Sequence, residues 1–295
     1  MIHQEHVTKI LNGTGLAREI RADLRTKILA SKIKPGLAVV LVGQDPASQI
    51  YVDFKKKASE DVGIQLESFE SEDDLSEKKL IKLIQKLNEK RSIHGILVQL
   101  PLPDHIDEQK IIASIVPEKD VDGFHPVNVG WLSIGHPLLV SATAKAIWRM
   151  IRSTNVDVRG KEVVVVGASN IVGKPIAQIF LNKRATVTVC HSKTANLALH
   201  TLRADILVTA VGKPNLITHD MVKPGAIVVD AGITRTEEGK VAGDVDFERV
   251  KEVAGWISPV PGGVGPMTVA MLLENTYEAM RRIEGMDAQS VMSFE

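Results

Sequence analysis

The sequence has little of what marks disulfide-stabilised, metal-binding or membrane proteins. Its 295 residues contain one cysteine, Cys190, so neither an intrachain disulfide nor a cysteine-cluster metal site can form. No apolar run reaches the roughly 20 residues that a membrane-spanning helix requires, and the first residues, from Met1 to His6, lack the apolar core of a signal peptide. We therefore expect a cytoplasmic protein in a reducing compartment, without a metal ion and without membrane contact.

An excess of either charge is also absent. Lysine plus arginine and aspartate plus glutamate number 36 each, so the formal net charge is zero. Because no basic stripe dominates the sequence, nucleic acid is not expected as a partner. Hydrophobic residues make up 44% of the chain and charged residues 24%, which is typical of a globular protein, and the length favours two domains.

Short apolar segments rich in β-branched residues alternate with helical patterns along nearly the whole chain. Strands are expected at residues 37–42, 95–100, 162–166, 186–190, 205–210 and 227–230. Helices are expected at residues 16–30, 48–62, 76–88, 107–115, 143–153, 175–182 and from Thr268 onward. Strands that are apolar throughout are buried on both faces, so the alternation predicts βαβ units and parallel sheets.

The pattern breaks near residues 130–141, where glycine, proline and small residues cluster, and it restarts at Gly160. We therefore predict an α/β fold with two α/β domains around a cleft. Residues 1–140 plus 268–295 would form the first, catalytic domain. Residues 141–267 would form the second, a Rossmann-type dinucleotide-binding domain.

One segment, residues 259–268, reads Pro-Val-Pro-Gly-Gly-Val-Gly-Pro-Met-Thr. Proline removes backbone donors and glycine removes side-chain bulk, so such a loop can press its main chain against a flat ligand. Proline and glycine also mark ordinary turns. Because this segment lies between a strand-like run at residues 253–257 and a long helix, where ligands of α/β proteins bind, a ligand site is favoured.

Residues 162–175 are typical of the strand, tight turn and helix that bind a dinucleotide. Gly167 permits the turn, Gly173 allows the helix to approach the strand, and Pro175 suits the first helical turn. The free N–H groups of that turn would face a pyrophosphate. Ser169 stands near the second glycine of the full G-x-G-x-x-G motif, so an ordinary glycine turn is the alternative.

The next predicted strand ends at Cys190 and is followed by His191-Ser192-Lys193-Thr194. A Rossmann domain that prefers NAD usually has an acidic residue here, which holds both ribose hydroxyls. None is present, whereas the hydroxyls and Lys193 would tolerate a 2′-phosphate, so the segment favours NADP. His191 alone is more typical of a structural residue than of a catalytic one.

Three motifs in the first half of the chain carry candidate site residues. Tyr51 and Lys55 share one face of a predicted helix, either as a stacking and proton-transfer pair or as a surface pair. Gln99 ends an apolar strand and, if buried, needs a partner that it can orient. Asp122 lies in the segment KDVDGF, which is either an acidic turn or an acceptor for an N–H-rich heterocycle. A Tyr-x-x-x-Lys pair also occurs in short-chain dehydrogenases, but there it follows the cofactor turn.

In order and spacing, these motifs resemble the bifunctional methylenetetrahydrofolate dehydrogenase/methenyltetrahydrofolate cyclohydrolase family. The resemblance rests on the Tyr51–Lys55 pair, on the segments VQLPLP, KDVDGF, VGASNIVGKP and CHSKT, and on the loop PVPGGVGPMT, and it extends from about Leu11 to Arg282. It implies an enzyme that oxidises 5,10-methylenetetrahydrofolate with NADP and hydrolyses the methenyl product to 10-formyltetrahydrofolate. It also implies a homodimer in one-carbon metabolism and purine biosynthesis, with folate bound by the first domain.

The resemblance further implies roles for individual residues. Lys55 would move the proton, Gln99 would orient Lys55, and Asp122 would hold the pterin, with no metal ion needed. The substrate would also be bound by Ser48, Tyr51, Pro261, Gly262 and Gly263. The cofactor would be bound by Gly167, Ala168, Ser169, Ile171, Val172, His191, Ser192, Thr194, Gly212, Ile233 and Thr268.

Two departures from the family pattern concern the cofactor half. The family has Gly-Arg-Ser where this chain has Gly167-Ala168-Ser169, and that arginine often meets the NADP 2′-phosphate. The family has Pro-Cys-Thr-Pro where residues 141–144 read Ser-Ala-Thr-Ala. NADP is expected, with NAD as the alternative cofactor. The rival functions are a folate- or nucleotide-binding regulatory protein and a cyclohydrolase with weak dehydrogenase activity, and the intact pair of Lys55 and Gln99 argues against a mere binder.

Overall fold

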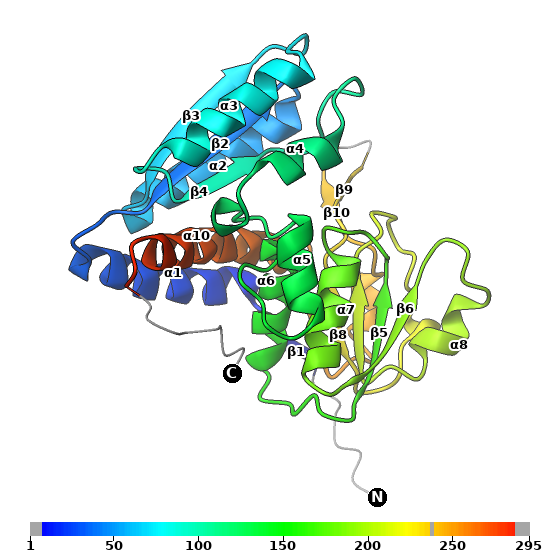
Figure 1. Ribbon diagram of the computed structural model, residues 1–295. Helices are drawn as coiled ribbons and strands as arrows, with labels where there is room; N and C mark the ends of the chain where they lie inside the picture. Colours follow the sequence, from blue (N-terminus) through cyan, green and yellow to red (C-terminus); the bar gives the residue numbers. More distant parts are fainter. Residues whose placement is uncertain (1–7, 237–238, 287–295) are drawn as a thin grey trace, which may run out of the picture. The chain divides into compact units, whose positions relative to one another are not determined.

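The computed structural model describes residues 8–236 and 239–286, which form two compact units (Figure 1). The six-stranded unit comprises residues 8–17 and 143–268, and the three-stranded unit comprises residues 18–142 and 269–286. Helices α1 (Gly13–Ala30) and α10 (Val264–Ile283) each begin in the six-stranded unit and end in the three-stranded unit. No helix in this part of the chain is long and apolar enough to cross a membrane.

All strands of the six-stranded sheet are parallel. Their order is β1 (Lys9–Ile10), β11 (Trp256–Ile257), β8 (Ile227–Asp230), β7 (Ile206–Thr209), β5 (Glu162–Val166) and β6 (Thr186–Cys190). From β5 the chain runs outward to β6 and then returns to β7 on the other side of β5. The strand order therefore reverses between β5 and β7, the switch point at which Rossmann-type sheets bind their ligands. The predicted α/β fold with a Rossmann-type domain is confirmed.

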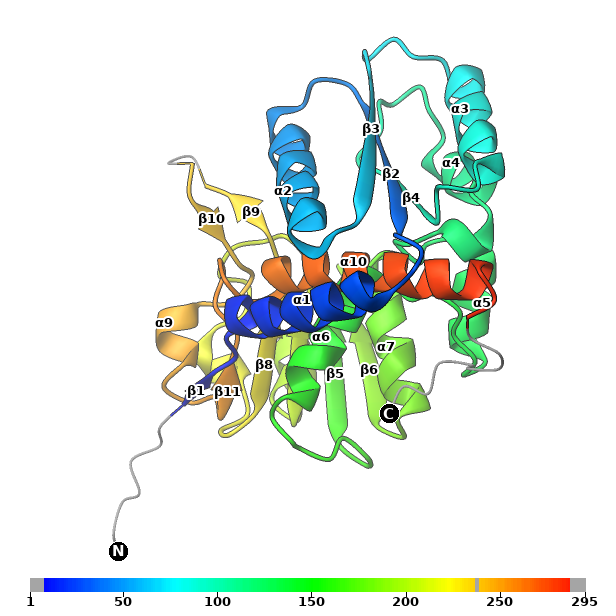
Figure 2. The same ribbon diagram turned by 90° about the vertical axis from the view of Figure 1, so that its left-hand side faces the viewer.

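Helices cover the six-stranded sheet. Along one face lie α6 (Ala142–Arg152) and α7 (Gly173–Asn182) (Figure 2). Trp148 of α6 and Phe180 of α7 pack edge to face, with ring centroids 6.0 Å apart. The shorter elements are α8 (Leu197–Thr201), the 3-10 helix η2 (His219–Met221), the antiparallel pair β9 (Thr234–Arg235) and β10 (Val241–Ala242), and α9 (Phe247–Val250). Residues of α8, η2 and α9 pack in one core cluster with the buried side chains of β5, β7 and β8.

The three-stranded sheet is also parallel, in the order β3 (Gln65–Ser71), β2 (Gly36–Val42) and β4 (Gly95–Val98). Helix α2 (Pro46–Val62) lies on one face, and α3 (Glu77–Glu89) and α4 (Glu108–Ser114) lie on the other (Figure 2). Every residue of β2 and β4 is buried, as expected for apolar strands that are covered on both faces. The 3-10 helix η1 (Pro117–Lys119) and α5 (Pro126–Ser133) follow.

The structure differs from the sequence prediction at several elements. The short strands β1, β9 and β10 and the helices α5, α8 and α9 are absent from the expected set. Strand β3 is missing from the predicted set because its sequence, QLESFES, is largely polar and its residues are exposed or half-buried at the sheet edge. Helix α10 begins at Val264, before the expected Thr268, so the second half of the proline–glycine segment is helical. Pro266 fits there because N–H groups in the first turn have no acceptor within the helix. The other predicted strands and helices are present, with ends shifted by a few residues.

Candidate active site and cofactor site

Helix α2 carries the first candidate residues and is capped at both ends. At its start, Asp45 accepts hydrogen bonds from the backbone N–H and the hydroxyl of Ser48, both at 2.8 Å. At its end, Gly63 adopts a left-handed conformation with φ of 87°, which closes the last turn. These caps fix the helix on which Tyr51 and Lys55 lie one turn apart. Ser48, predicted to bind substrate, is buried beside the cap.

The side chains of Lys55 and Gln99 are in contact. Lys55 Nζ donates to Gln99 Oε1 at 2.8 Å, and Gln99 Nε2 donates to Leu100 O at 2.8 Å. The backbone N–H of Gln99 donates to Val40 O at 2.8 Å, which holds this residue against β2. Because the amide nitrogen is engaged by Leu100, the amide oxygen faces the lysine.

The ammonium of Lys55 and the carboxylate of Asp122 influence each other's charge. Lys55 is half-buried, and burial lowers the pKa of its ammonium, while the charge of Asp122 raises it. Burial raises the pKa of Asp122 to about 6, while Lys55 lowers this pKa and Asp120 raises it. At neutral pH Asp122 is therefore mainly ionised, and Lys55 releases its proton more readily than a lysine in water. The structure thus brings the three predicted catalytic residues together.

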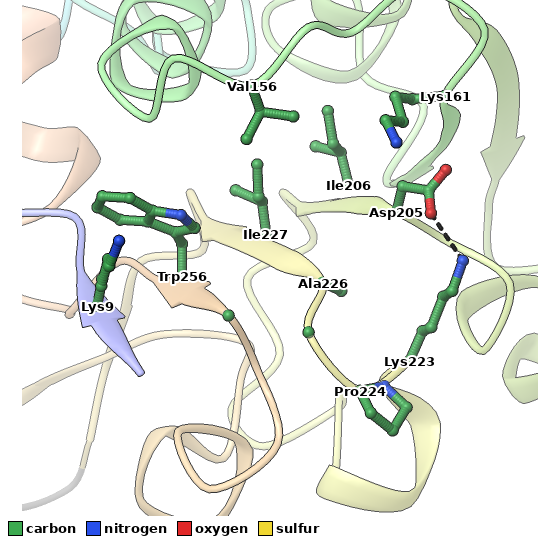
Figure 3. A pocket seen from close by; sticks show the side chains of 12 residues that line it. Lys9, Val156, Lys161, Asp205, Ile206, Lys223, Pro224, Ala226, Ile227 and Trp256 are labelled. Atoms are coloured by element: carbon green, nitrogen blue, oxygen red, sulfur yellow. Dashed lines mark hydrogen bonds and ion pairs between the residues drawn. The ribbon is translucent and has the colours of Figure 1, made fainter. Parts of the chain in front are cut away.

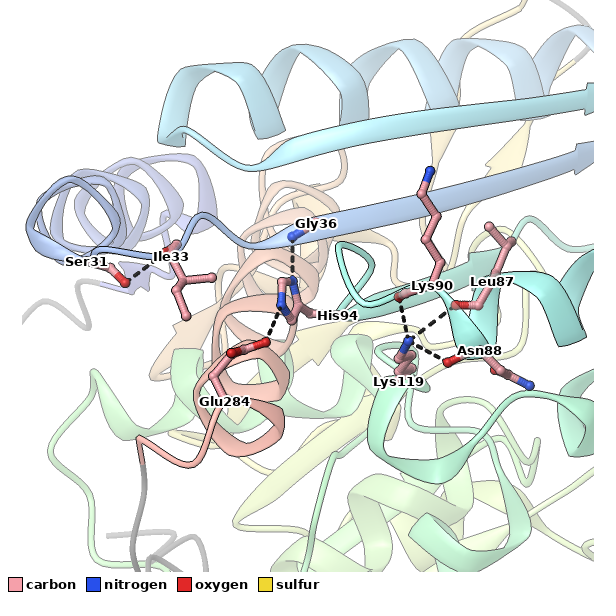
Figure 4. Close-up of polar contacts among 9 residues, drawn as sticks. All are labelled: Ser31, Ile33, Gly36, Leu87, Asn88, Lys90, His94, Lys119 and Glu284. Carbon is pink, nitrogen blue, oxygen red and sulfur yellow. Dashed lines mark hydrogen bonds and ion pairs between the residues drawn. The ribbon is translucent and has the colours of Figure 1, made fainter.

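Lys119 anchors the loop that carries Asp122. Its Nζ donates to the carbonyl oxygens of Leu87, Asn88 and Lys90 at 3.2, 2.7 and 3.0 Å (Figure 4). These carbonyls lie at the carboxyl end of α3, where a cation also favours the helix dipole. Sequence reasoning assigns no role to Lys119, because its partners lie about thirty residues away in the chain.

Asp120 also holds the loop that carries Asp122. It is buried and accepts hydrogen bonds from His125 N and from Asn128 Nδ2, both at 2.8 Å. Asn275 of α10 donates to the carbonyl oxygen of Val121 at 2.8 Å. The backbone around Asp122 is therefore held by partners from three separate segments.

Of the remaining substrate-binding predictions, one lies in the three-stranded unit and the others in the six-stranded unit. Tyr51 is 40% exposed, so its ring has a free face on which a flat ligand can stack. Gly262 has φ of 103°, a left-handed backbone that favours glycine. A Cβ on Gly13 would lie 1.8 Å from the carbonyl oxygen of Gly263, so the start of α1 and this loop pack backbone against backbone. The folate contacts of Pro261, Gly262 and Gly263 stay a prediction.

In the six-stranded unit, the turn after β5 has room for glycine only. Gly167 has φ of 121°, and a Cβ there would lie 2.4 Å from the carbonyl oxygen of Ala210. A Cβ on Gly173 would lie 2.0 Å from the carbonyl oxygen of Gly167. The turn therefore packs directly against the loop after β7, at the switch point of the sheet. A backbone cradle at this point fits the phosphates of a dinucleotide.

One expectation about this turn is wrong. The N–H groups of Val172 and Gly173 are not free, because both are directed at the hydroxyl oxygen of Ser169, at 3.2 and 3.4 Å. The N–H of Lys174 donates to the carbonyl oxygen of Ser169 at 3.0 Å, and Pro175 has no N–H. The first turn of α7 is thus closed by Ser169, the residue that replaces the second glycine of the full motif.

The segment after β6 forms a tight turn. Thr194 Oγ1 accepts the N–H of His191 at 2.9 Å, and His191 Nδ1 accepts the N–H of Lys193 at 3.2 Å. The imidazole of His191 thus helps to close this turn, and its contact with the cofactor stays a prediction. Ser192 and Lys193 are exposed at the carboxyl end of β6.

The other predicted cofactor residues divide into two groups. Gly212, with φ of 75°, and Ile233, which is 49% exposed, follow β7 and β8, and a Cβ on Gly212 would lie 3.9 Å from the carbonyl oxygen of Ile233. They therefore lie side by side at the same edge of the sheet as the Gly167 turn, which also carries half-buried Ala168 and exposed Ile171. In contrast, Thr268 lies on α10, where its hydroxyl bonds to Val264 O at 3.2 Å and to Thr143 Oγ1 at 3.3 Å.

A pocket of about 350 Å³ lies at the opposite edge of this sheet, at the amino ends of β7, β8 and β11 (Figure 3). Lys9, Lys161, Lys223 and Trp256 are among the residues that line it, and Lys223 Nζ lies 2.7 Å from Asp205 Oδ1. None of the predicted site residues lines this pocket. The pocket is therefore separate from the predicted cofactor site.

Two family models match the chain. The model of the tetrahydrofolate dehydrogenase/cyclohydrolase catalytic domain matches residues 11–122, and that of the NAD(P)-binding domain matches residues 141–284. The bifunctional protein FolD of Geobacillus thermodenitrificans is 55% identical over 278 residues, which are 93% of this chain and 98% of that protein. FolD of Moorella thermoacetica is 55% identical over 277 residues, 93% of this chain and 99% of that protein.

Solved structures show the same similarity. The bifunctional FolD methylenetetrahydrofolate dehydrogenase/cyclohydrolase of Campylobacter jejuni has a TM-score of 0.92 at 48% identity, covering 93% of this chain and 99% of that one. The corresponding dehydrogenase–cyclohydrolase of Trypanosoma brucei, solved with NADP cofactor and an inhibitor, has a TM-score of 0.90 at 38% identity. That match covers 93% of this chain and 98% of the other.

Proposed function

Because the chain belongs to the tetrahydrofolate dehydrogenase/cyclohydrolase family, it is a bifunctional enzyme of folate one-carbon chemistry, and we propose how its residues divide the work. The enzyme oxidises 5,10-methylenetetrahydrofolate to 5,10-methenyltetrahydrofolate, and it hydrolyses this product to 10-formyltetrahydrofolate. NADP, when bound, accepts the hydride that the first reaction releases.

The hydrogen bond between Lys55 and Gln99, with the charge of Asp122 beside it, is the observation that supports the hydrolytic assignment. Hydrolysis forms a bond between the oxygen of water and the methenyl carbon, and the water then loses a proton. A lysine whose pKa is lowered by burial can accept this proton and pass it to the folate nitrogen as the ring C–N bond breaks. Gln99 keeps the lysine in position for both transfers.

Asp122 and Tyr51 serve folate binding in this proposal. A carboxylate accepts hydrogen bonds and does not donate them, which matches the N–H-rich edge of a reduced pterin. The pKa of Asp122 is about 6, so the carboxylate is available at neutral pH. The exposed ring of Tyr51 would stack on the pterin, with Ser48 at the same end of α2. Pro261, Gly262 and Gly263 are proposed as further folate-binding residues.

The cofactor would be held in the six-stranded unit, by the turn around Gly167 and by the loops that carry Gly212 and Ile233. The proposed folate-binding domain comprises residues 1–140 plus 268–295, and the proposed cofactor-binding domain comprises residues 141–267. In the structure, residues 8–17 belong to the six-stranded unit instead. Discrimination between NADP and NAD would be modest, because Ala168 offers no cation to a 2′-phosphate. Ser192 and Lys193, exposed after β6, are the candidates for that contact.

We further propose that the protein is a cytoplasmic homodimer that supplies one-carbon units to purine biosynthesis, and that it binds neither nucleic acid nor membranes. Support for a dimer comes from β6, which lies at the edge of the six-stranded sheet and pairs with β5 alone among the described strands. Such an edge offers unpaired backbone groups to a second copy. Light scattering of the purified protein gives its mass directly, and a monomer at micromolar concentration would contradict this assembly.

The experiment that tests the proposed function measures three rates on one preparation. These are the hydrolysis of methenyltetrahydrofolate, the reduction of NADP and the reduction of NAD with methylenetetrahydrofolate. We expect hydrolysis that depends on Lys55, together with reduction of NADP in preference to NAD. Folate binding without either turnover would favour a regulatory protein, and hydrolysis with negligible NADP reduction would favour a cyclohydrolase with a weak dehydrogenase.

A further inference from the structure

Two carboxylates to which the proposed function gives no role are buried side by side in the six-stranded unit. Asp230 ends β8, and Asp244 follows β10. Their exposed fractions are 3% and 0%. A buried carboxylate without hydrogen-bond partners strongly destabilises a fold. The partners of these two carboxylates therefore identify the segments that they hold in place.

Asp244 clamps the loop after β7 at both sides of Gly212. Its Oδ2 accepts the N–H of Val211 at 2.7 Å, and its Oδ1 accepts the N–H of Lys213 at 2.7 Å. Hydrogen bonds of backbone N–H groups to a carboxylate are stronger than those to a neutral acceptor. The clamped loop begins at Ala210, whose carbonyl oxygen packs against the Gly167 turn. One carboxylate thus shapes one of the two loops at the switch point of the sheet.

Asp230 holds the loop after β8 and also holds Asp244. Its Oδ1 accepts the N–H groups of Gly232 at 2.8 Å and Asp244 at 3.1 Å, and its Oδ2 accepts the N–H of Val245 at 2.9 Å. Thr209 Oγ1 completes the set at 3.1 Å from Oδ1. Asp230 therefore joins the end of β7, the loop that leads to Ile233 and the segment that carries the second carboxylate.

The same network reaches the proline–glycine loop. The backbone N–H of Asp230 donates to the buried hydroxyl of Ser258 at 2.8 Å, directly before Pro259. A Cβ on Gly243 would lie 2.1 Å from Asp230 Oδ2 and 2.8 Å from a methyl group of Val260. Gly243 thus fills the space between the carboxylate and this loop, and no larger residue fits there.

A second glycine shows how closely Asp244 is surrounded. A Cβ on Gly232 would lie 2.2 Å from Asp244 Oδ1. The backbone of the β8 loop is therefore in direct contact with the carboxylate that clamps the β7 loop. Any displacement of this carboxylate changes both loops at once.

We infer that Asp230 and Asp244 are positioning residues, which hold the loops around Gly212 and Ile233 in the shape that binds the dinucleotide. The inference rests on the proposed cofactor contacts of those loops. Both aspartates are almost fully buried. Among the described residues, their carboxylates accept hydrogen bonds from backbone N–H groups and from the hydroxyl of Thr209. Loss of the Asp244 clamp on the loop around Gly212 should therefore change cofactor affinity and leave the folate reaction that needs no cofactor.

Asp244→Asn tests this inference with almost no change in volume. An amide can accept from one of the two N–H groups and must present its NH₂ to the other. We expect the NADP dissociation constant, measured by calorimetry on the cofactor-free enzyme, to rise at least tenfold. Amide hydrogen exchange at Val211 or Lys213 should become faster in the cofactor-free protein, and the hydrolysis rate should stay within twofold of the parent.

The matched control is Asp246→Asn, two residues further along the same segment. Asp246 is half-buried, and its nearest described cation is Arg249, at 3.7 Å. NADP affinity, exchange at Val211 and Lys213, and hydrolysis should all match the parent in this variant. An equal loss of NADP affinity in both variants would trace the effect to the stability of the whole segment and would overturn the positioning role.

Gly232→Ala perturbs the same carboxylate from a neighbouring residue. It provides an independent test if the Asp244→Asn chain does not fold. The added methyl group should displace Asp244 and weaken NADP binding without any change of charge. The two substitutions should also be non-additive, because both act on one clamp. If either single variant folds, changes the exchange of Val211 or Lys213 and still binds NADP as the parent does, the pair has only a structural role and the inference is wrong.

Ile233→Ala separates this inference from the proposed cofactor contacts. If this variant binds NADP normally and Asp244→Asn binds it weakly, Ile233 is not a cofactor contact. That result would still support positioning of the Gly212 loop by Asp244. If Ile233→Ala binds NADP weakly and Asp244→Asn binds it normally, Ile233 remains a proposed cofactor contact, and the positioning role of Asp244 is overturned.

Discussion

Replacing Lys55 with methionine should separate the two reactions of this enzyme. Methionine keeps the length and apolar body of the side chain, so the half-buried position is filled and the proton carrier is lost. A positioned acid–base group contributes about 10²- to 10⁴-fold to a rate, so hydrolysis of methenyltetrahydrofolate should fall by roughly this factor. The loss should grow as the pH rises, because the parent gains unprotonated lysine and the variant has no group that titrates in its place.

The dehydrogenase reaction should respond differently, through Asp122. Lys55 lowers the pKa of Asp122, so its removal raises that pKa above about 6. At pH 7 an acid with a pKa of about 6 is roughly nine-tenths ionised, and any rise of this pKa reduces the ionised fraction. The rate of NADP reduction at low folate concentration should therefore fall at pH 7 by far less than the rate of hydrolysis, and it should recover as the pH rises.

Both rates are measured on the same variant, hydrolysis as the loss of methenyltetrahydrofolate absorbance with the uncatalysed rate subtracted, and oxidation as NADPH formation. Lys56→Met is the matched control, since Lys56 is exposed on the same helix and should be replaceable without effect on either rate. Hydrolysis at the parent rate in Lys55→Met would refute the proton-transfer role. An equal fall of both rates at all pH values would make Lys55 a folate-binding residue instead.

Three further predictions concern single residues. Asp122→Ala should impair both reactions and folate affinity together, and normal folate affinity with loss of hydrolysis alone would make Asp122 the proton carrier. Ala168→Arg should strengthen NADP binding by about 1.5–3 kcal/mol, and an equal calorimetric gain for NAD would show that the 2′-phosphate does not approach this turn. Asp122→Asn should raise the free energy of unfolding in urea more at pH 7 than at pH 5. Burial raises the pKa of Asp122 to about 6, above its unfolded value, so the charge destabilises the fold fully above that pH. As the pH falls below about 6, the destabilisation decreases, and it disappears below the unfolded pKa. A pH-independent difference would contradict this prediction.

The parts of the fold that the sequence predicts are those with a local cause. Strands β5, β7 and β8 consist mainly of buried β-branched and other apolar residues, so their composition alone predicts them. Strand β3 has no such signal, because an edge strand can be largely polar and is defined by its pairing with β2. The sequence does not predict the early start of α10 either, because proline and glycine suit both a loop and the first turn of a helix.

The candidate site shows the same division between local and distant causes. The helical spacing of Tyr51 and Lys55 is a local property, and the sequence predicts it. The hydrogen bonds of Lys119 to the end of α3 depend on residues about thirty positions away, and no local sequence pattern predicts them. Asp230 and Asp244 are likewise ordinary acidic residues in the sequence. Their role becomes visible only when the N–H groups that surround them are known.

The neutral amide at position 99 explains how the charge of Lys55 can be set by two opposing effects. Burial lowers the pKa of the ammonium and Asp122 raises it, so the protonation of the lysine depends on their balance. A carboxylate at position 99 would add a second attraction in contact with Nζ and would hold the proton on the lysine. Gln99 supplies an acceptor at 2.8 Å without that charge, and its bond to Leu100 keeps the acceptor oxygen directed at Lys55. The amide therefore positions the lysine while leaving its proton transferable, which a proton carrier near neutral pH requires.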